Sequence, residues 1–174
     1  PFTSEEFTSD IIISKNNASI FSKDRLINKA LISHSQDNID EAKKYYQQII
    51  ERGIHDPRIL NNYGAILNKE GNIVKAKNLY EKSIDLFPNR PEAYSNLGSL
   101  LRKIDKKKEA VELHIKAINI NPNIPEFHFN LSKTLIDLND LEGAEKSILK
   151  AINLKPESSN YFHILGIILK RKGN

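Results

Sequence analysis

The amino-acid sequence predicts an all-α protein, built as a solenoid of stacked antiparallel helix pairs. Residues 57–90 and 91–124 form two 34-residue units that carry the same residue types at the same places. Such a period is typical of solenoids, in which each helix pair buries its apolar face by stacking on its neighbours. Within each unit, apolar residues recur at intervals of three and four, as amphipathic helices require. The matched positions are Leu60, Tyr63, Gly64, Leu67, Ala76, Tyr80 and Pro88, which recur as Tyr94, Leu97, Gly98, Leu101, Ala110, His114 and Pro122.

The same 34-residue step extends the pattern in both directions. Residues 23–56 form a weaker unit, in which Gly53-Ile54 replaces the expected proline, and residues 125–158 form a fourth unit. A further first helix recurs over the partial unit 159–174. The sequence therefore predicts one domain, over residues 23–174, of about four helix pairs and a final single helix.

Turn-forming residues separate the two helices of each unit, and prolines open the first helices, where a fixed φ and a missing N–H cost nothing. The turn formers are Gly71, Asp105 and Asn139, and the prolines are Pro57, Pro91 and Pro125. The expected helices cover residues 24–35, 39–52, 58–69, 73–86, 92–104, 107–120, 126–138, 141–153 and 159–171. Residues 1–22 do not fit the repeat, and we expect a poorly ordered arm or a cap on the first unit.

Composition narrows the class of protein. The 39% hydrophobic and 28% charged fractions are ordinary for a globular chain, and the absence of cysteine excludes disulfides and thiolate sites. No apolar run reaches the length of a membrane span, and the first residues do not read as a secretory signal. We therefore expect a cytoplasmic module with no membrane partner. Because the chain starts at Pro1 and contains no methionine, a fragment or a processed product is expected.

The repeated pattern resembles the tetratricopeptide repeat over roughly residues 23–174. The resemblance implies a right-handed superhelix, in which the first helices line a concave groove that binds extended peptides or partner helices. It also gives the small residues a role, because they would let the two backbones of a pair approach closely. These residues are Gly64, Gly98 and Gly166 on first helices and Ala76, Ala110 and Ala144 on second helices.

Four asparagines occupy the sixth position of successive first helices, which the resemblance places in the groove. Asparagine costs about 0.5–0.7 kcal/mol relative to alanine inside a helix. Its amide can pair with both groups of a peptide unit. The row resembles the asparagine ladder of the O-linked N-acetylglucosamine transferase superhelix, and it ends at Ile164. Bracing of the neighbouring helix and chance remain alternatives. The row consists of Asn28, Asn62, Asn96 and Asn130.

Five more residues are candidates for the groove: Asn61, Ser95, Ser99, Lys133 and Arg102. They do not reproduce the carboxylate clamp of chaperone-binding members of the family, which needs lysine, asparagine and arginine at set positions. A glutamate stands at the second position of two first helices, so recognition of a Glu-Glu-Val-Asp tail is not expected.

Basic residues gather near the ends of the first helices, and the net charge is +4. A stripe for acidic peptide or nucleic-acid phosphate is one interpretation. A solvated rim is the favoured one, because acidic residues interleave and no aromatic run accompanies the charge. The basic residues are Lys69, Arg102, Lys103, Lys106, Lys107, Lys108, Lys170 and Arg171.

No catalytic pattern stands out. The histidines lack the spacing of a metal site, and His114 and His128 fall at core positions of the repeat. We therefore expect no enzyme activity, cofactor or metal. The favoured function is a protein-protein interaction module that binds an extended peptide or partner protein in the groove. The alternative is the substrate-recruiting arm of a larger glycosyltransferase, sulfotransferase or methyltransferase. Self-association through the final helix is a further expectation.

Overall fold

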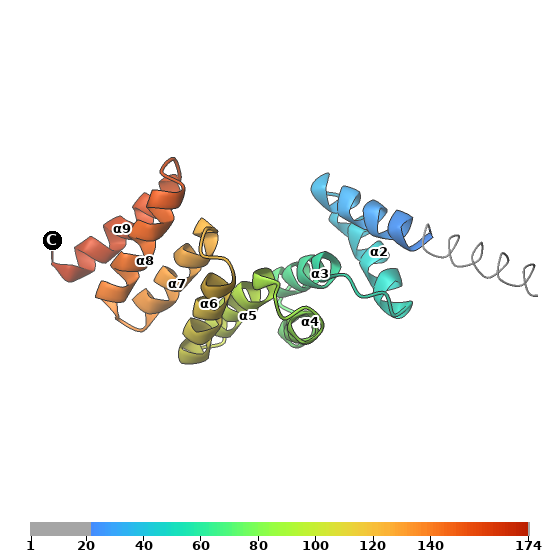
Figure 1. Ribbon diagram of the computed structural model, residues 1–174, viewed down its shortest axis with the longest axis horizontal. Helices are drawn as coiled ribbons and strands as arrows, with labels where there is room; N and C mark the ends of the chain where they lie inside the picture. Colours follow the sequence, from blue (N-terminus) through green and yellow to red (C-terminus); the bar gives the residue numbers. More distant parts are fainter. Residues whose placement is uncertain (1–21, 174) are drawn as a thin grey trace, which may run out of the picture. The chain divides into compact units, whose positions relative to one another are not determined.

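The computed structural model describes residues 22–173, and within that range every regular element is a helix. Figure 1 shows the helices in chain order. The described chain divides into two compact units, residues 22–59 and residues 60–173. The predicted arm lies outside the described residues, apart from Ser22, which already belongs to the first helix.

The N-terminal unit contains a helix over 22–35 and α2 (Ile39–Glu51). Ile27 and Ala30 on the first helix and Ala42 and Tyr46 on the second are buried. The Tyr46 hydroxyl lies 2.6 Å from His34 Nδ1. Apolar spacing and a short turn thus produce the first predicted helix pair, with the small alanines at its centre.

The C-terminal unit begins at Leu60, inside α3, and its helices agree with the predicted ranges to within two residues. Each helix packs against the next one along the chain from α4 to α9, and α7 also contacts the first helices on either side, α5 and α9. The all-α stack of helix pairs is therefore confirmed. The helices are α3 (Pro57–Lys69), α4 (Ile73–Leu86), α5 (Pro91–Lys103), α6 (Lys107–Ile120), α7 (Pro125–Asp137), α8 (Leu141–Leu154) and α9 (Ser159–Lys172).

Left-handed backbone follows each first helix at the same repeat position. Glycine adopts positive φ without cost, and aspartate and asparagine tolerate it better than other residues do. The predicted turn formers are therefore confirmed, and the step of 34 residues extends to both ends of the described chain. The φ values are 59° at Asp37, 83° at Gly71, 65° at Asp105, 60° at Asn139 and 87° at Gly173.

Close packing within a helix pair requires glycine at two of the three predicted positions. A Cβ atom at Gly64 would lie 2.6 Å from Tyr80 Cε1, and one at Gly98 would lie 2.8 Å from His114 Cε1. At Gly166 a Cβ atom would meet nothing within 4 Å. The prediction is wrong for Gly166, because no second helix of the described chain covers α9 at that point.

Candidate functional site

The first helices of the C-terminal unit are joined by polar contacts whose partners are 35 residues apart. We call these contacts the first-helix seam. Since the repeat is 34 residues long, each contact joins one position to the following position of the next first helix. The donor–acceptor pairs are Lys103 Nζ to Asn68 Oδ1 (3.2 Å), Asn130 Nδ2 to Ser95 Oγ (3.1 Å), Arg102 Nη1 to Asp137 Oδ2 (2.6 Å), Tyr161 Oη to Glu126 Oε1 (3.3 Å) and Arg171 Nη1 to the Ile136 carbonyl oxygen (3.3 Å).

The four predicted asparagines do not behave alike. Asn130 donates to Ser95, so the bracing interpretation holds at this position. Asn62 and Asn96 are half-buried, and neither amide hydrogen-bonds to another residue in 22–173. Asn28 is exposed on the N-terminal unit. Only the middle two asparagines of the row therefore combine partial burial with an uncommitted amide.

Two of the other groove candidates are almost fully buried in the free chain. Asn61 is 6% exposed and Ser95 is 3% exposed, whereas Ser99 is half-buried. Ser95 accepts the bond from Asn130. Asn61 occupies the equivalent place on α3, and its Oδ1 has no partner among the described residues. Ser95 thus supports the seam, while Ser99 retains exposed surface.

The two cationic candidates differ in their surroundings. Arg102 forms an ion pair with Asp137, and both side chains are partly shielded from solvent. The Lys133 ammonium lies 5.1 Å from the centre of the Phe129 ring and has no ion-pair partner within 22–173. Burial lowers the pKa of Lys133, and the nearby charge of Arg102 adds to that effect. The Lys133 charge is therefore less well compensated than that of Arg102.

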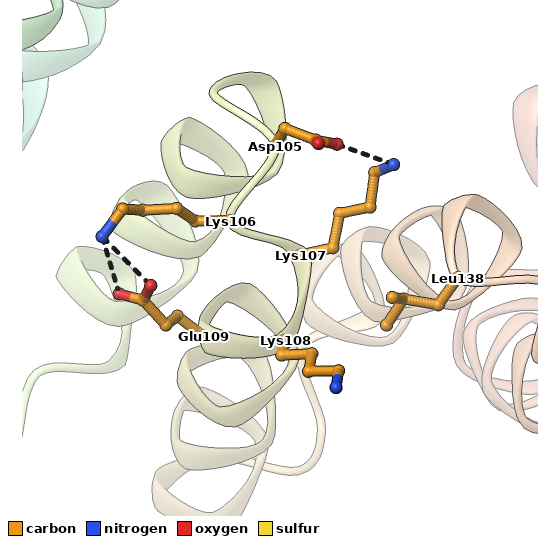
Figure 2. A pocket seen from close by; sticks show the side chains of 6 residues that line it. All are labelled: Asp105, Lys106, Lys107, Lys108, Glu109 and Leu138. Atoms are coloured by element: carbon orange, nitrogen blue, oxygen red, sulfur yellow. Dashed lines mark hydrogen bonds and ion pairs between the residues drawn. The ribbon is translucent and has the colours of Figure 1, made fainter.

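A shallow hollow of about 380 Å³ lies at the turn between α5 and α6. Figure 2 shows Leu138 on one side of it and three consecutive lysines on the other. Lys107 pairs with Asp105 at 2.7 Å, and Lys106 pairs with Glu109 at 3.1 Å. These neutralising contacts agree with the favoured interpretation of a solvated rim at this turn.

His114 and His128 are buried, as their repeat positions predicted. His128 Nε2 lies 2.8 Å from the Pro122 carbonyl oxygen. His114 is 0% exposed, and neither ring nitrogen has a partner in the described part of the chain. Burial lowers the pKa of His114 to about 4, with smaller contributions from Arg102 and Lys133. This histidine is thus a neutral packing residue beneath the seam.

The residues that the structure describes contain neither a candidate metal site nor a membrane-spanning helix. No group of three or more histidine, aspartate or glutamate side chains within 22–173 could hold a metal ion. None of the helices over these residues combines the length and apolar character needed to cross a bilayer.

Several solved structures share this fold. A crystal structure of the MamA protein superposes with a TM-score of 0.71 at 20% identity, over 87% of this chain and 82% of that one. MamA from Desulfovibrio magneticus RS-1, residue 41 to the end, gives 0.73 at 24% identity, over 87% and 85%. The first tetratricopeptide repeat region of Spaghetti (RPAP3), solved with the HSP90 peptide SRMEEVD, gives 0.64 at 21% identity, over 68% and 94%.

Sequence comparison leads to the same fold. No curated protein matches the chain. The tetratricopeptide repeat matches residues 55–123 in one form and residues 24–52 and 125–158 in another, which together cover well over half of the sequence. The repeat positions, the all-α stack and these matches agree, and the chain belongs to the tetratricopeptide repeat family.

Proposed function

We propose that the chain is a protein interaction module, and that an extended peptide or a peptide-like segment of a partner protein binds along the first helices of the C-terminal unit. The observation that carries this proposal is the pair of uncommitted, half-buried amides of Asn62 and Asn96 on adjacent first helices. An amide side chain offers a donor and an acceptor, which match the N–H and C=O of one peptide unit. The RPAP3 structure with its bound peptide adds support from the same fold.

The proposed contact reads the peptide backbone rather than its side chains. Each backbone hydrogen bond would contribute about 0.5–1.5 kcal/mol. Asn130 is not counted in this role, because its amide nitrogen already donates to Ser95 and is held by that bond. The apolar Ile164 stands at the next place in the row and packs against the core of α8 and α9. The backbone-reading part of the row is therefore expected to end at α5.

Asparagine substitutions separate binding from bracing. The double change Asn62→Ala and Asn96→Ala is expected to weaken selection of a phage-displayed random nonapeptide library at least tenfold. The same change should leave the free energy of unfolding unaltered or raise it by about 0.5 kcal/mol per site, because alanine is the better helix former. Sequencing of the enriched pools measures peptide selection, and urea denaturation measures stability.

Asn130→Ala is the matched control. It leaves the buried Ser95 hydroxyl without its partner, and this loss of about 1 kcal/mol should outweigh the gain of about 0.5 kcal/mol in helix propensity, so the free energy of unfolding should fall. A large loss of stability in the Asn62 and Asn96 double variant, with peptide selection retained, would contradict the proposal and show that these two residues brace the stack.

The recruiting-arm alternative and self-association are two further predictions that remain to be tested. The recruiting-arm alternative would place its substrate on the same helices, and the reading frame beyond Asn174 tests it. Self-association would use α9, where Phe162 is 50% exposed, and sedimentation at two protein concentrations tests that expectation.

A further inference from the structure

The surface between α5 and α7 is bounded at two points by bonds of the first-helix seam. Residues three or four apart lie on the same face of a helix, so each of these helices presents a short row of side chains to the other. The bonds join the two ends of the rows, and Ser99 and Lys133 lie between the ends. The rows are Ser95, Ser99 and Arg102 on α5 and Asn130, Lys133 and Asp137 on α7.

Lys133 is held in place but not neutralised. Its ammonium lies 5.1 Å from the centre of the Phe129 ring, one helical turn earlier on α7, which restricts the lysine without supplying a negative charge. Asp137 is one turn later on the same face and would be the natural partner. Its carboxylate instead accepts from Arg102 at 2.6 Å on the neighbouring helix.

The local charge is therefore positive. Arg102, Asp137 and Lys103 are the charged groups that act on Lys133, and the two cations lower its pKa in addition to the effect of burial. Lys103 bonds to the neutral amide of Asn68 rather than to an acid. Lys133 and Arg102 thus share one carboxylate on the surface where α5 faces α7, and Lys103 adds a third positive charge nearby.

We propose that Lys133, Ser99 and Arg102 form a subsite for an aspartate or glutamate side chain of the bound peptide. This inference rests on the proposed function. The Lys133 ammonium would provide the charge, the half-buried Ser99 hydroxyl would donate to one carboxylate oxygen, and Arg102 has donors beyond the one that Asp137 uses. Asn96 precedes Ser99 by three residues on the same face, so backbone and side chain of one peptide residue could be bound together.

An acidic peptide fits this surface better than a nucleic acid does. The lysines that would extend the positive charge toward the turn, Lys106 and Lys107, already pair with Glu109 and Asp105. A phosphate backbone gains affinity from a continuous run of uncompensated cations, whereas a single carboxylate needs only the local group. The surface therefore matches one or two acidic side chains.

A charge-swap selection tests the subsite. A phage-displayed library of random nonapeptides is selected on the wild-type chain, on Lys133→Glu, on Lys133→Gln and on the control Lys108→Glu. Lys108 is an exposed lysine of the hollow in Figure 2 without an ion pair in the described chain. Circular dichroism melting checks that each variant folds, and Lys133→Gln serves as the neutral variant.

The expected result is an enrichment of aspartate or glutamate of about fivefold over the input library on the wild type and on Lys108→Glu, a size typical of one partly shielded ion pair. Lys133→Gln should lose this enrichment, and Lys133→Glu should replace it by enrichment of lysine or arginine. Equal loss in Lys108→Glu would overturn the subsite in favour of general charge attraction.

The remaining outcomes distinguish the two proposals. A peptide pool that is enriched without any acidic preference, and that depends on Asn62 and Asn96, would overturn the subsite and leave the proposed function standing. No enrichment of any pool would overturn both. If a fluorescein-labelled oligothymidylate bound tightly, and Lys133→Glu and Lys108→Glu lost this binding equally, the ligand would be a nucleic acid rather than a peptide.

Discussion

His114→Phe is expected to stabilise the fold by about 1–3 kcal/mol at pH 7, because it removes two buried ring nitrogens that have no hydrogen-bond partner in the described chain. The site can hold a six-membered ring. Tyr80 occupies the equivalent place one unit earlier and packs beneath Gly64, as His114 packs beneath Gly98. Urea denaturation of the two proteins measures the difference.

The same substitution is expected to change how stability depends on pH. The pKa of His114 is about 4 in the folded chain and near 6.5 when unfolded, so only the unfolded chain takes up the proton between these values. This proton uptake lowers the free energy of unfolding of the wild type. The loss is nearly absent above pH 6.5, grows by about 1.4 kcal/mol per pH unit below it, and totals about 3 kcal/mol at pH 4. The phenylalanine variant lacks this contribution, and its advantage over the wild type should widen as the pH falls.

His128 provides the control for this experiment. It is also buried, but its Nε2 lies 2.8 Å from the Pro122 carbonyl oxygen, a contact that phenylalanine cannot make. His128→Phe should therefore lower the free energy of unfolding by about 1 kcal/mol at pH 7. If His114→Phe destabilised the protein as much as His128→Phe does, the His114 nitrogens would have a partner that the structure does not show.

Two glycine substitutions are expected to act in opposite directions. Gly64→Ala should destabilise the chain by about 1–3 kcal/mol, because the new methyl group would lie 2.6 Å from Cε1 of the buried Tyr80 ring and force the helix pair apart. Gly166→Ala should stabilise it by about 0.5–1 kcal/mol, since alanine is the better helix former and its methyl group meets nothing within 4 Å.

Thermal and urea denaturation of both variants check this pair. Each variant replaces a glycine at the eighth position of a first helix by alanine, so the intrinsic helix propensity changes equally. A difference in sign can then come only from packing against the following helix. Equal stabilisation by both substitutions would show that α3 and α4 can separate without cost.

Repeat periodicity was sufficient for the helices and turns. Helix ends follow from proline at the first helical position and from left-handed residues 34 apart, both of which are local properties of the chain. The same reasoning failed at Gly166, where the equivalent residue type lacks the equivalent neighbour. Equivalence of position predicts local conformation, but it does not guarantee an equivalent contact.

In the candidate site, too, the sequence predicted the positions of the residues but not their contacts. The sequence placed Asn62, Asn96, Ser99, Lys133 and Arg102 on first helices, and the structure puts each of them there. Their partners could not be derived from a step of 34 residues, because the observed contacts step by 35. A search for complementary polar pairs at that longer step would have found Arg102 with Asp137 and Ser95 with Asn130.

The sequence by itself determined the all-α class, the helix boundaries and the family, because these depend on local spacing of apolar, small and turn-forming residues. Only the tertiary structure decided which asparagine braces the stack, which serine is buried and which cation lacks a counter-charge. The physical reason is the stagger between neighbouring first helices. A one-residue offset sets the partner of every side chain on the seam, and that offset arises from how whole helices pack rather than from any single repeat.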